Sequence, residues 1–280
     1  MLNSVWRRIV IKVGSALISP DAKGCSTRYL LAIARFINEC RQQGVEVVLV
    51  SSGSVAAGRN AIAFTHQPLP INVKQAMAAV GQTEMMAAWS HLFDFRCAQI
   101  LLTHDDLANR RRYLNIDNTL RTLLANQVLP IVNENDSVAT AELKVGDNDN
   151  LAAMVAILVD ADALIICSDI DGLYTANPRS NADACFIPRV EQINADIYAM
   201  AGGSHHAIGT GGMLTKIQAA DKATRQGVDT LIINGQQTTS FDALLRGEAA
   251  GTLFVRQQDR LSAKKHWLQH SLKSQGSIIL

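Results

Sequence analysis

The sequence is poor in the features that mark disulfide-rich, metal-binding and redox proteins. Its 280 residues include five cysteines, an odd number, and no two of them have the CxxC spacing of a metal or redox site. We therefore expect buried free thiols and a reducing, cytoplasmic location. The cysteines are Cys25, Cys40, Cys97, Cys167 and Cys185.

Long apolar runs and an excess of one charge are missing as well. The longest apolar stretches, such as Leu151–Val159, are too short to span a bilayer. Residues 1–8 lead directly into a strand-like run, without the apolar region of a signal peptide. The 26 basic and 25 acidic residues leave a net charge of +1, so the charge calls for neither a membrane nor a nucleic-acid partner. With 48% hydrophobic residues, the chain can still bury one large core.

Short β-branched runs alternate with helical patterns along most of the chain. The strand-like runs are continuously apolar, so we expect them to be buried on both faces. The predicted fold class is α/β, with an open, twisted, mostly parallel sheet sandwiched between helices. We predict strands at Arg8–Val13, Val45–Ser51, Ala98–Thr103, Val128–Asn133, Ala163–Ser168 and Thr230–Asn234. We predict helices at Thr27–Gln42, Lys74–Phe95, Leu107–Asn126, Asn150–Val159, Met213–Gln226 and Ser240–Arg246.

Four of these strands end in small or polar residues, and ligands of such sheets bind beyond the strands' carboxyl ends. A lysine near the end of a buried strand, such as Lys12, must find an anion or lie at the surface, because burying a lone charge is costly. Gly14 then gives the backbone room to approach a phosphate. The four ends are Lys12–Ser15, Ser51–Ser54, Asn133–Asp136 and Ser168–Asp169.

Two of these ends allow more than one interpretation. Ser52, Gly53 and the small residues up to Gly58 suit anion binding at a helix N-terminus, but tight helix–strand packing explains the same glycines. Asp136 could accept hydrogen bonds from a substrate ammonium group, or form an Asx turn or helix cap.

Amides and carboxylates stand side by side at residues 147–150, just before an apolar helical pattern. Asp149 or Asn150 can cap that helix, but a cap needs only one such residue. A carboxamide, as in Asn148, can donate to a substrate carboxylate, and a carboxylate can hold lysine ammonium groups. The segment lacks the twelve-residue spacing of an EF-hand. We therefore predict a substrate-binding and charge-organising site here.

A glycine-rich loop at 209–216 opens a predicted helix and ends in Lys216. Exposed backbone N–H groups, the helix N-terminus and a lysine point charge together form a phosphate cradle. The loop is neither a Walker A motif nor GxGxxG. Adjacent His205 and His206 rarely chelate one metal together, and Arg110–Arg112 is typical of a solvated helix face.

With these motifs in place, the chain resembles the amino acid kinase family, and within it the kinases of glutamate. The match extends over nearly all of residues 8–256. It depends on the segments Ile11–Ser15, Val50–Gly53, Val132–Asp136, Lys144–Leu151, Ser168–Thr175 and Gly209–Lys216.

The resemblance implies transfer of the γ-phosphoryl group of ATP to the side-chain carboxylate of L-glutamate. The product would be L-glutamyl 5-phosphate, in the first step of proline biosynthesis. It also implies Mg²⁺, feedback inhibition by L-proline, and a homodimer or homotetramer. The nucleophile would be a carboxylate that is already ionised at pH 7, so no catalytic histidine or cysteine is required.

Site residues follow from the matching positions. The resemblance implies that Lys12 and Lys216 hold the phosphates while Asp149 organises them. It implies glutamate binding by Ser52, Asp136 and Asn148, and it assigns no Mg²⁺ ligand. The implied ATP-binding residues are Lys12, Gly14, Ser168, Asp169, Thr210, Gly211, Gly212, Met213, Leu214, Thr215 and Lys216.

The chain also departs from the family pattern. Asn177 stands where the family usually has aspartate, and Ala207 replaces a common glycine. Many members continue into a C-terminal PUA domain, an RNA-binding fold by analogy. We expect a kinase domain at 1–256, and at 257–280 a polar helical linker with only the opening strand of such a domain. No nucleic-acid partner is expected without it.

Three other functions remain open at this point. The nearest is another amino acid kinase, such as an acetylglutamate kinase or an aspartokinase. An NAD-dependent oxidoreductase would need a glycine fingerprint after the first strand and an acidic residue ending the second, where this chain has Ser51 and Ser52. A non-catalytic amino-acid sensor would keep the fold without needing the two lysines for its response.

Overall fold

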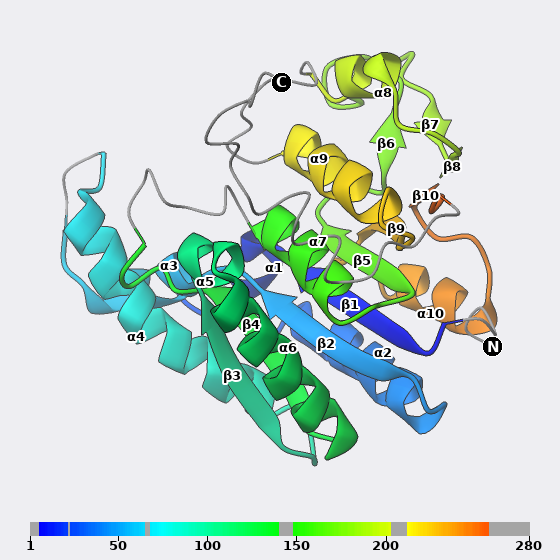
Figure 1. Cartoon of the computed structure of the whole chain (residues 1–280). Coiled ribbons are helices and arrows are strands. Elements are labelled where there is room, and N and C mark those ends of the chain that lie inside the picture. Colours follow the sequence, from blue (N-terminus) through cyan, green and yellow to red (C-terminus); the bar gives the residue numbers. More distant parts are fainter. Residues whose placement is uncertain (1–5, 22, 65–67, 140–147, 203–211, 258–280) are drawn as a thin grey trace, which may run out of the picture.

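The computed structural model describes residues 6–21, 23–64, 68–139, 148–202 and 212–257 (Figure 1). Its centre is an eight-stranded sheet with the strand order β3-β4-β2-β1-β5-β9-β10-β8. The strands pair in parallel except for β10, which runs antiparallel to β9, and a separate hairpin pairs β6 with β7. The strands are β1 (Arg8–Val13), β2 (Glu46–Ser51), β3 (Cys97–Leu102), β4 (Leu129–Glu134), β5 (Ala163–Ser168), β6 (Leu173–Tyr174), β7 (Phe186–Ile187), β8 (Arg189–Val190), β9 (Asp229–Asn234) and β10 (Thr252–Phe254).

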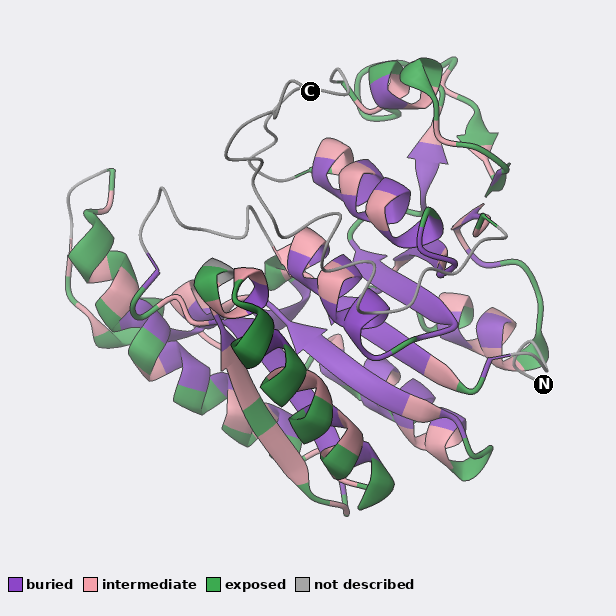
Figure 2. Ribbon diagram, viewed as in Figure 1, coloured by how far each residue is buried: buried purple, intermediate pink, exposed green. Residues whose placement is uncertain are grey.

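Helices cover both faces of this sheet, so the predicted α/β sandwich is confirmed. The helices are α1 (Ser15–Ile18), α2 (Leu30–Gln42), α3 (Ser54–Ala57), the 3₁₀ turn η1 (Gly58–Ala61), α4 (Ile71–Ser90), α5 (His104–Ala108), α6 (Arg110–Ala125), α7 (Asn148–Leu158), α8 (Ala195–Met200), α9 (Met213–Thr224) and α10 (Thr238–Arg246). One core packs α6, α7 and α9 against the sheet, and the other packs α2, α4 and α10 against the opposite face. Figure 2 shows the resulting burial of the central strands.

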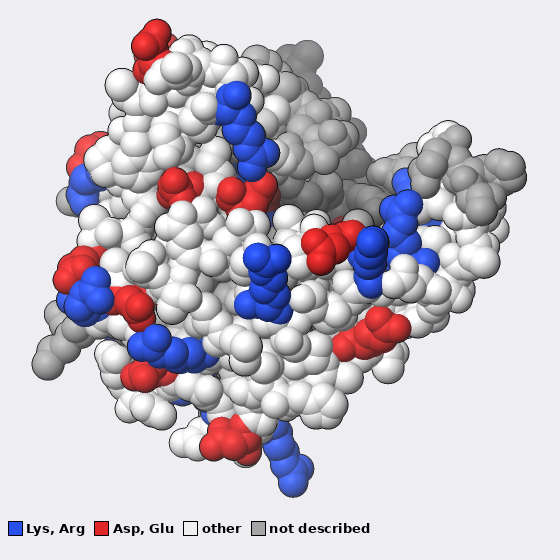
Figure 3. All heavy atoms as spheres, turned by 180° about the vertical axis from the view of Figure 1, so that it is seen from behind, with Lys and Arg blue, Asp and Glu red and all other residues white. Residues whose placement is uncertain are grey.

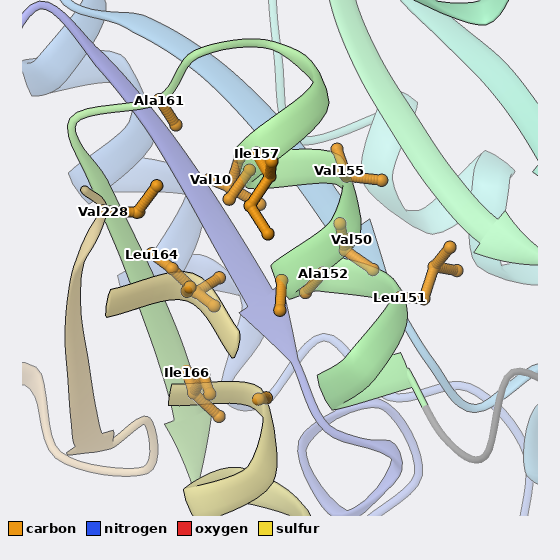
Figure 4. Close-up of a cluster of buried hydrophobic side chains, with 14 of the residues drawn as sticks. Val10, Val50, Leu151, Ala152, Val155, Ile157, Ala161, Leu164, Ile166 and Val228 are labelled. Carbon is orange, nitrogen blue, oxygen red and sulfur yellow. The ribbon is translucent and has the colours of Figure 1, made fainter. Parts of the chain in front are cut away.

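The alternation of side chains along β1 decides which residues reach which core. Val10 belongs to the core under α7, whereas Ile9 and Ile11 belong to the opposite core. Figure 4 shows Val10 next to Ile157 of α7 in this cluster. Because side chains of a strand alternate with a period of two, Lys12 lies on the same face as Val10. The lysine therefore emerges under the helices α7 and α9.

Each of the six predicted strands is confirmed to within one residue at each end. The helix predicted at 107–126 is wrong as a single helix, because the chain forms α5 and α6 with a break at Asn109. Thr103 caps α5 in a capping box with Asp106, and the Asn109 side chain accepts a hydrogen bond from the backbone N–H of Arg112. The short strands β6, β7, β8 and β10 were not predicted, because two or three residues carry no periodic signal.

The structure also bears on the predictions made for the cysteines and for membrane-spanning segments. The five cysteines are free, as predicted, and Cys40 and Cys167 are buried; the expectation of burial is wrong for Cys185, which is exposed. Within the described ranges, no helix combines the length and the apolar character that a membrane crossing requires.

Candidate active site

A cavity of about 850 Å³ opens at the carboxyl ends of β1 and β5. Its lining comes from the turn after β1, the first residues of α7, the segment between β5 and residue 179, and the start of α9. This is the edge of the sheet at which ligands of parallel α/β proteins bind, so the position agrees with the rule used for the sequence.

Two lysines meet one carboxylate in this cavity. The ammonium nitrogen Nζ of Lys12 lies 2.5 Å from Oδ1 of Asp149, and Nζ of Lys216 lies 3.1 Å from Oδ2 of the same residue. All three side chains are buried. Thr215 donates its hydroxyl to Oδ2 of Asp149 at 2.9 Å. Two positive charges against one negative charge leave this buried group with a net charge of +1, which suits an anionic ligand.

The charge of Asp149 is set by two opposing effects. Burial by itself raises the pKa of the carboxyl, but the nearby ammonium groups of Lys12 and Lys216 and the hydrogen bond from Thr215 outweigh it. The net result lowers the pKa of Asp149 to about 2. Asp149 is therefore a carboxylate throughout the neutral range and can keep both lysines in place.

The fold explains why three residues so distant in sequence converge. Lys12 leaves β1 on the face covered by α7, while Asp149 lies in the first turn of α7 and Lys216 in the first turn of α9. Gly212 precedes α9 with a φ of +84°, a conformation that favours glycine, and its carbonyl accepts a hydrogen bond from Lys216 Nζ at 3.3 Å. Both helices begin at the cavity, so their N-terminal dipoles add positive potential there.

An exposed ion pair lies on the opposite side of the cavity. Arg179 donates to Oδ2 of Asp169 at 2.9 Å, and both residues line the cavity. The hydrogen bond from Arg179 is the main cause that holds the pKa of the Asp169 carboxyl below its usual value. Asn177, at the position where aspartate is usual, accepts a hydrogen bond from the backbone N–H of Arg179 through its carboxamide oxygen. The amide thus supports the turn that presents the arginine.

The residues predicted to bind glutamate are divided between two cavities. Ser52 and Asn148 line the large cavity, and the backbone N–H of Ser52 is bonded to the carbonyl of Val13 at the end of β1. Asp136 instead lines a neighbouring cavity of about 230 Å³, where its Oδ2 accepts a hydrogen bond from Ser54 Oγ at 2.8 Å. Its carboxylate therefore ties the end of β4 to α3.

The glycines between β2 and α4 serve packing as well as the site. A Cβ at Gly58 would lie 2.0 Å from the carbonyl oxygen of Met77, and one at Gly81 would lie 1.9 Å from that of Ser54. Gly58 therefore serves packing, but against the helix α4 and not against a strand as predicted. Gly53 precedes α3 with a φ of +101°. At Gly14 an added Cβ would make only ordinary contacts, 3.5 Å from the carbonyl oxygen of Cys167.

The predicted nucleotide-binding residues have different surroundings. Gly14, Ser168, Asp169, Gly212, Met213 and Lys216 line the large cavity. Leu214 packs against the core under α9, and Thr215 is bonded to Asp149. Thr210, Gly211, Ala207, the pair His205 and His206, residues 144–147 and the segment 258–280 lie outside the described residues.

Two residues that belong to the candidate site or support it were not predicted from the sequence. Arg179 was not singled out, because nothing in its local pattern points to Asp169. Gln82 lies in α4 and was not singled out; its amide oxygen accepts a hydrogen bond from Asn133 at 2.9 Å. A buried glutamine in a helix facing the strand ends could have drawn attention to it. Across the described ranges, no three histidine, cysteine, aspartate or glutamate side chains are placed to hold a metal ion.

A buried lysine pair bridged by a carboxylate, beside two helix N-termini at the edge of a parallel sheet, defines an enzyme of phosphoryl transfer. Residues 7–234 match the model of the amino acid kinase family. The chain therefore belongs to the amino acid kinase family.

The relatives are close over almost the whole chain. The glutamate 5-kinase of Idiomarina loihiensis is 62% identical over 275 residues, which is 98% of this chain and 74% of the relative. The glutamate 5-kinase of Salinibacter ruber is 54% identical over 98% of this chain and 73% of its own length. Glutamate 5-kinase 1 of Pseudoalteromonas translucida is also 54% identical, over 98% of this chain and 74% of the relative. Within the amino acid kinase family, the chain therefore belongs to the group of glutamate 5-kinases, and the predicted family is confirmed.

A solved structure supports the fold independently. The crystal structure of UMP kinase from Bacillus anthracis superposes with a TM-score of 0.60, covering 90% of this chain and 97% of that one. With 13% sequence identity, this likeness concerns the fold alone.

Proposed function

We propose that the chain transfers the γ-phosphoryl group of ATP to the side-chain carboxylate of L-glutamate, giving L-glutamyl 5-phosphate and ADP. The relatives carry the name glutamate 5-kinase, and the resemblance implies that this reaction is the first step of proline biosynthesis. The observation that carries the proposal is the buried pair of Lys12 and Lys216 bridged by Asp149 in the large cavity.

The two lysines stabilise the transferring phosphoryl group. Its oxygens carry the developing charge in the transition state, and preorganised cations lower the energy of that charge in a site shielded from water. Asp149 holds both ammonium groups from one side, so their positions are set before the substrates arrive. The substrate carboxylate has an ordinary pKa of about 4.3 and is ionised at pH 7, so the attack needs no general base.

We assign the amino-acid substrate to the region between the two cavities. Ser52 and Asn148 offer a hydroxyl and a carboxamide from the large cavity, and Asp136 offers a carboxylate from the smaller one. A carboxylate or a carboxamide oxygen suits the α-ammonium group of glutamate, whereas a hydroxyl group suits its carboxylates. Ser54 and Asp136, which are joined by a hydrogen bond, both line the smaller cavity.

We assign ATP to the other side of the same cavity. Gly14, Ser168, Asp169 and Gly212–Lys216 would bind the nucleotide, and Thr210 and Gly211 join them on the basis of the resemblance alone. The nucleotide phosphates would then meet the N-terminus of α9 and the lysine pair.

Mg²⁺ fits this site as part of the nucleotide complex. It binds a few carboxylates together with phosphate oxygens and water, and Asp149 is already engaged by two lysines and Thr215. Asp169, beside Arg179, is a carboxylate of the nucleotide side that could contribute. When bound, the ion would neutralise charge on the β- and γ-phosphates.

Other expectations remain proposals. Feedback inhibition by L-proline, a homodimer or homotetramer, and a cytoplasmic location rest on the resemblance and on cysteine usage. The division into a kinase domain at 1–256 and a segment at 257–280 is likewise a proposal.

ADP release with different acceptors tests the function. Glutamate, N-acetylglutamate and aspartate are supplied in turn with ATP and Mg²⁺, and ADP is followed by a coupled assay. We expect turnover with glutamate above both others. Turnover confined to N-acetylglutamate or aspartate would replace this reaction by that of another amino acid kinase.

A further inference from the structure

A chain of side-chain amides leads from the exposed edge of the sheet to the cavity. Asn148 donates its Nδ2 to Oδ1 of Asn133 at 2.9 Å, and Asn133 donates its Nδ2 to Oε1 of Gln82 at 2.9 Å. Gln82 then donates its Nε2 to Oε1 of Gln99 at 3.2 Å. These residues belong to α7, β4, α4 and β3 respectively, so the amide chain connects elements on both faces of the sheet.

Asn133 has no access to water as an alternative partner, and Gln82 has little, at the point where it lines the smaller cavity. Asn133 is fully buried and Gln82 is 8% exposed, whereas Gln99 is exposed on the edge strand β3. A buried amide that loses a partner keeps its desolvation cost. Each middle amide is therefore held in one orientation by the neighbours on either side.

The direction of the amide chain has a chemical consequence at its inner end. Each amide nitrogen donates to the next residue in the direction of Gln99. The carboxamide nitrogen of Asn148 is therefore already used in its hydrogen bond to Asn133. Its oxygen Oδ1 is buried and accepts no hydrogen bond in the part of the chain that the structure describes. Because Asn148 lines the large cavity, a bound donor would supply the missing hydrogen bond.

We infer that Gln82 is a positioning residue for the amino-acid substrate. Through Asn133 it fixes the orientation in which Asn148 offers a carboxamide oxygen, an acceptor suited to an ammonium group. This inference rests on the proposed function, because it presumes that an amino acid binds beside Asn148. It also revises the sequence-based expectation that this carboxamide serves as a donor to a carboxylate.

Gln82→Leu tests the link itself. Leucine has a similar size but offers neither donor nor acceptor, so Asn133 loses its acceptor. We expect the KM for glutamate to rise about tenfold, as for the loss of one good hydrogen bond, while kcat and the KM for ATP change less than about twofold. Gln43→Leu, at an exposed position, is the matched control and should leave all three constants unchanged. An unchanged KM for glutamate in Gln82→Leu would overturn the inference.

Substitutions at Gln99, which lines the smaller cavity together with Gln82, test the direction of the amide chain while the three inner amides stay in place. Glutamate at this position can only accept, so Gln99→Glu retains the hydrogen bond from Gln82. Lysine can only donate, so Gln99→Lys opposes that direction and favours the reversed orientation of every amide. We expect a near-normal KM for glutamate in Gln99→Glu and a raised one in Gln99→Lys, with equal melting temperatures.

The outcomes separate this inference from the function on which it rests. Equal KM values in the two Gln99 variants, or a raised value only in Gln99→Glu, would contradict the amide chain while wild-type turnover of glutamate persists. If the wild type does not turn over glutamate at all, the proposed function itself fails.

Discussion

Asp149 contacts two lysine ammonium groups at once, so its charge state decides whether the buried group holds together. Its pKa in the folded protein, about 2, lies below the value of about 3.9 expected in an unfolded chain. A carboxyl with a lowered pKa contributes stability that is complete above the unfolded value. That contribution is lost as the pH falls towards the folded value.

A pH series of denaturant unfolding checks this effect. The difference in the free energy of unfolding between wild type and Asp149→Asn should be constant above about pH 5 and should fall by about 1 kcal/mol between pH 5 and pH 3. The asparagine variant cannot ionise, so it provides the baseline. A difference that stays constant through this range would mean that the two lysines do not lower the pKa of Asp149.

The lysines themselves are tested by truncation. Lys12→Ala and Lys216→Ala should each lower kcat by ~10²-fold or more, because each removes a preorganised charge that acts on the transferring phosphoryl group. Lys74→Ala removes an exposed lysine of α4 that lines neither cavity and should leave kcat unchanged. Steady-state kinetics on variants with wild-type melting temperatures provide the comparison. Near-normal kcat in both site variants would rule out this assignment, as a non-catalytic sensor would require.

Among the elements, α3 and α4 depend on a contact between glycines. Gly81→Ala would place a Cβ 1.9 Å from the carbonyl oxygen of Ser54 and 2.3 Å from the backbone nitrogen of Gly58, so the helices must separate. We expect a loss of about 1–3 kcal/mol or more in the free energy of unfolding. The KM for glutamate should also rise, because Ser52 lines the large cavity just before α3 and would move with that helix.

The matched control for that variant is Ala76→Ser, which adds one atom at an exposed position of the same helix. Its stability should change by less than about 0.5 kcal/mol. Denaturant unfolding of both variants decides the matter, and equal stabilities would show that the glycine contact is not tight.

A second element, the β6–β7 hairpin, is bonded to strand β10 of the sheet through the hydroxyl group of Thr252. Thr252 Oγ1 accepts a hydrogen bond from the backbone N–H of Leu173 at 2.8 Å and donates one to the carbonyl of Ile187 at 2.6 Å. Thr252→Val leaves both backbone groups without this partner and should cost about 1–3 kcal/mol.

Because the hairpin continues into the cavity residues 174–179, Thr252→Val should raise the KM for ATP more than that for glutamate. The same substitution at exposed Thr119 of α6 is the control and should affect neither. A larger effect on glutamate than on ATP would contradict the placement of the nucleotide.

At the scale of helices and strands, the sequence predicts long elements well and short ones poorly. Six strands were visible as apolar runs, because both their faces are buried. The break at Asn109 was missed, since the apolar spacing continues across it and only the cap of Asn109 reveals it. Strands such as β10 owe their existence to pairing with β9 and β8, a tertiary effect that local sequence does not encode.

In the whole molecule, the two lysines of the candidate site were easier to recognise in the sequence than the buried residues that support the site. Lys12 and Lys216 interrupt apolar or glycine-rich patterns, and each therefore stood out in the sequence. Gln82 and Gln99 did not, because an isolated glutamine in a helix or edge strand is typical of a surface. Their importance depends on the strand order, which brings β3 and β4 beside α4.

The back of the molecule carries charges of both signs in its described part. Seen from behind, lysine and arginine side chains lie among aspartate and glutamate side chains (Figure 3). This mixture matches the net charge of +1. A further concentration of positive charge is internal, at the lysine pair, where an anionic substrate would meet it.

The most direct measurement of the central claim follows the oxygen atoms. Glutamate labelled with ¹⁸O in its side-chain carboxylate is incubated with ATP, Mg²⁺ and hydroxylamine, which attacks the acyl carbon of an acyl phosphate and releases phosphate. If the carboxylate attacks the γ-phosphorus, the bridging oxygen leaves with that phosphate. The account predicts one ¹⁸O atom in each released phosphate together with the glutamyl hydroxamate; unlabelled phosphate, with ADP formed at the same rate, would contradict it.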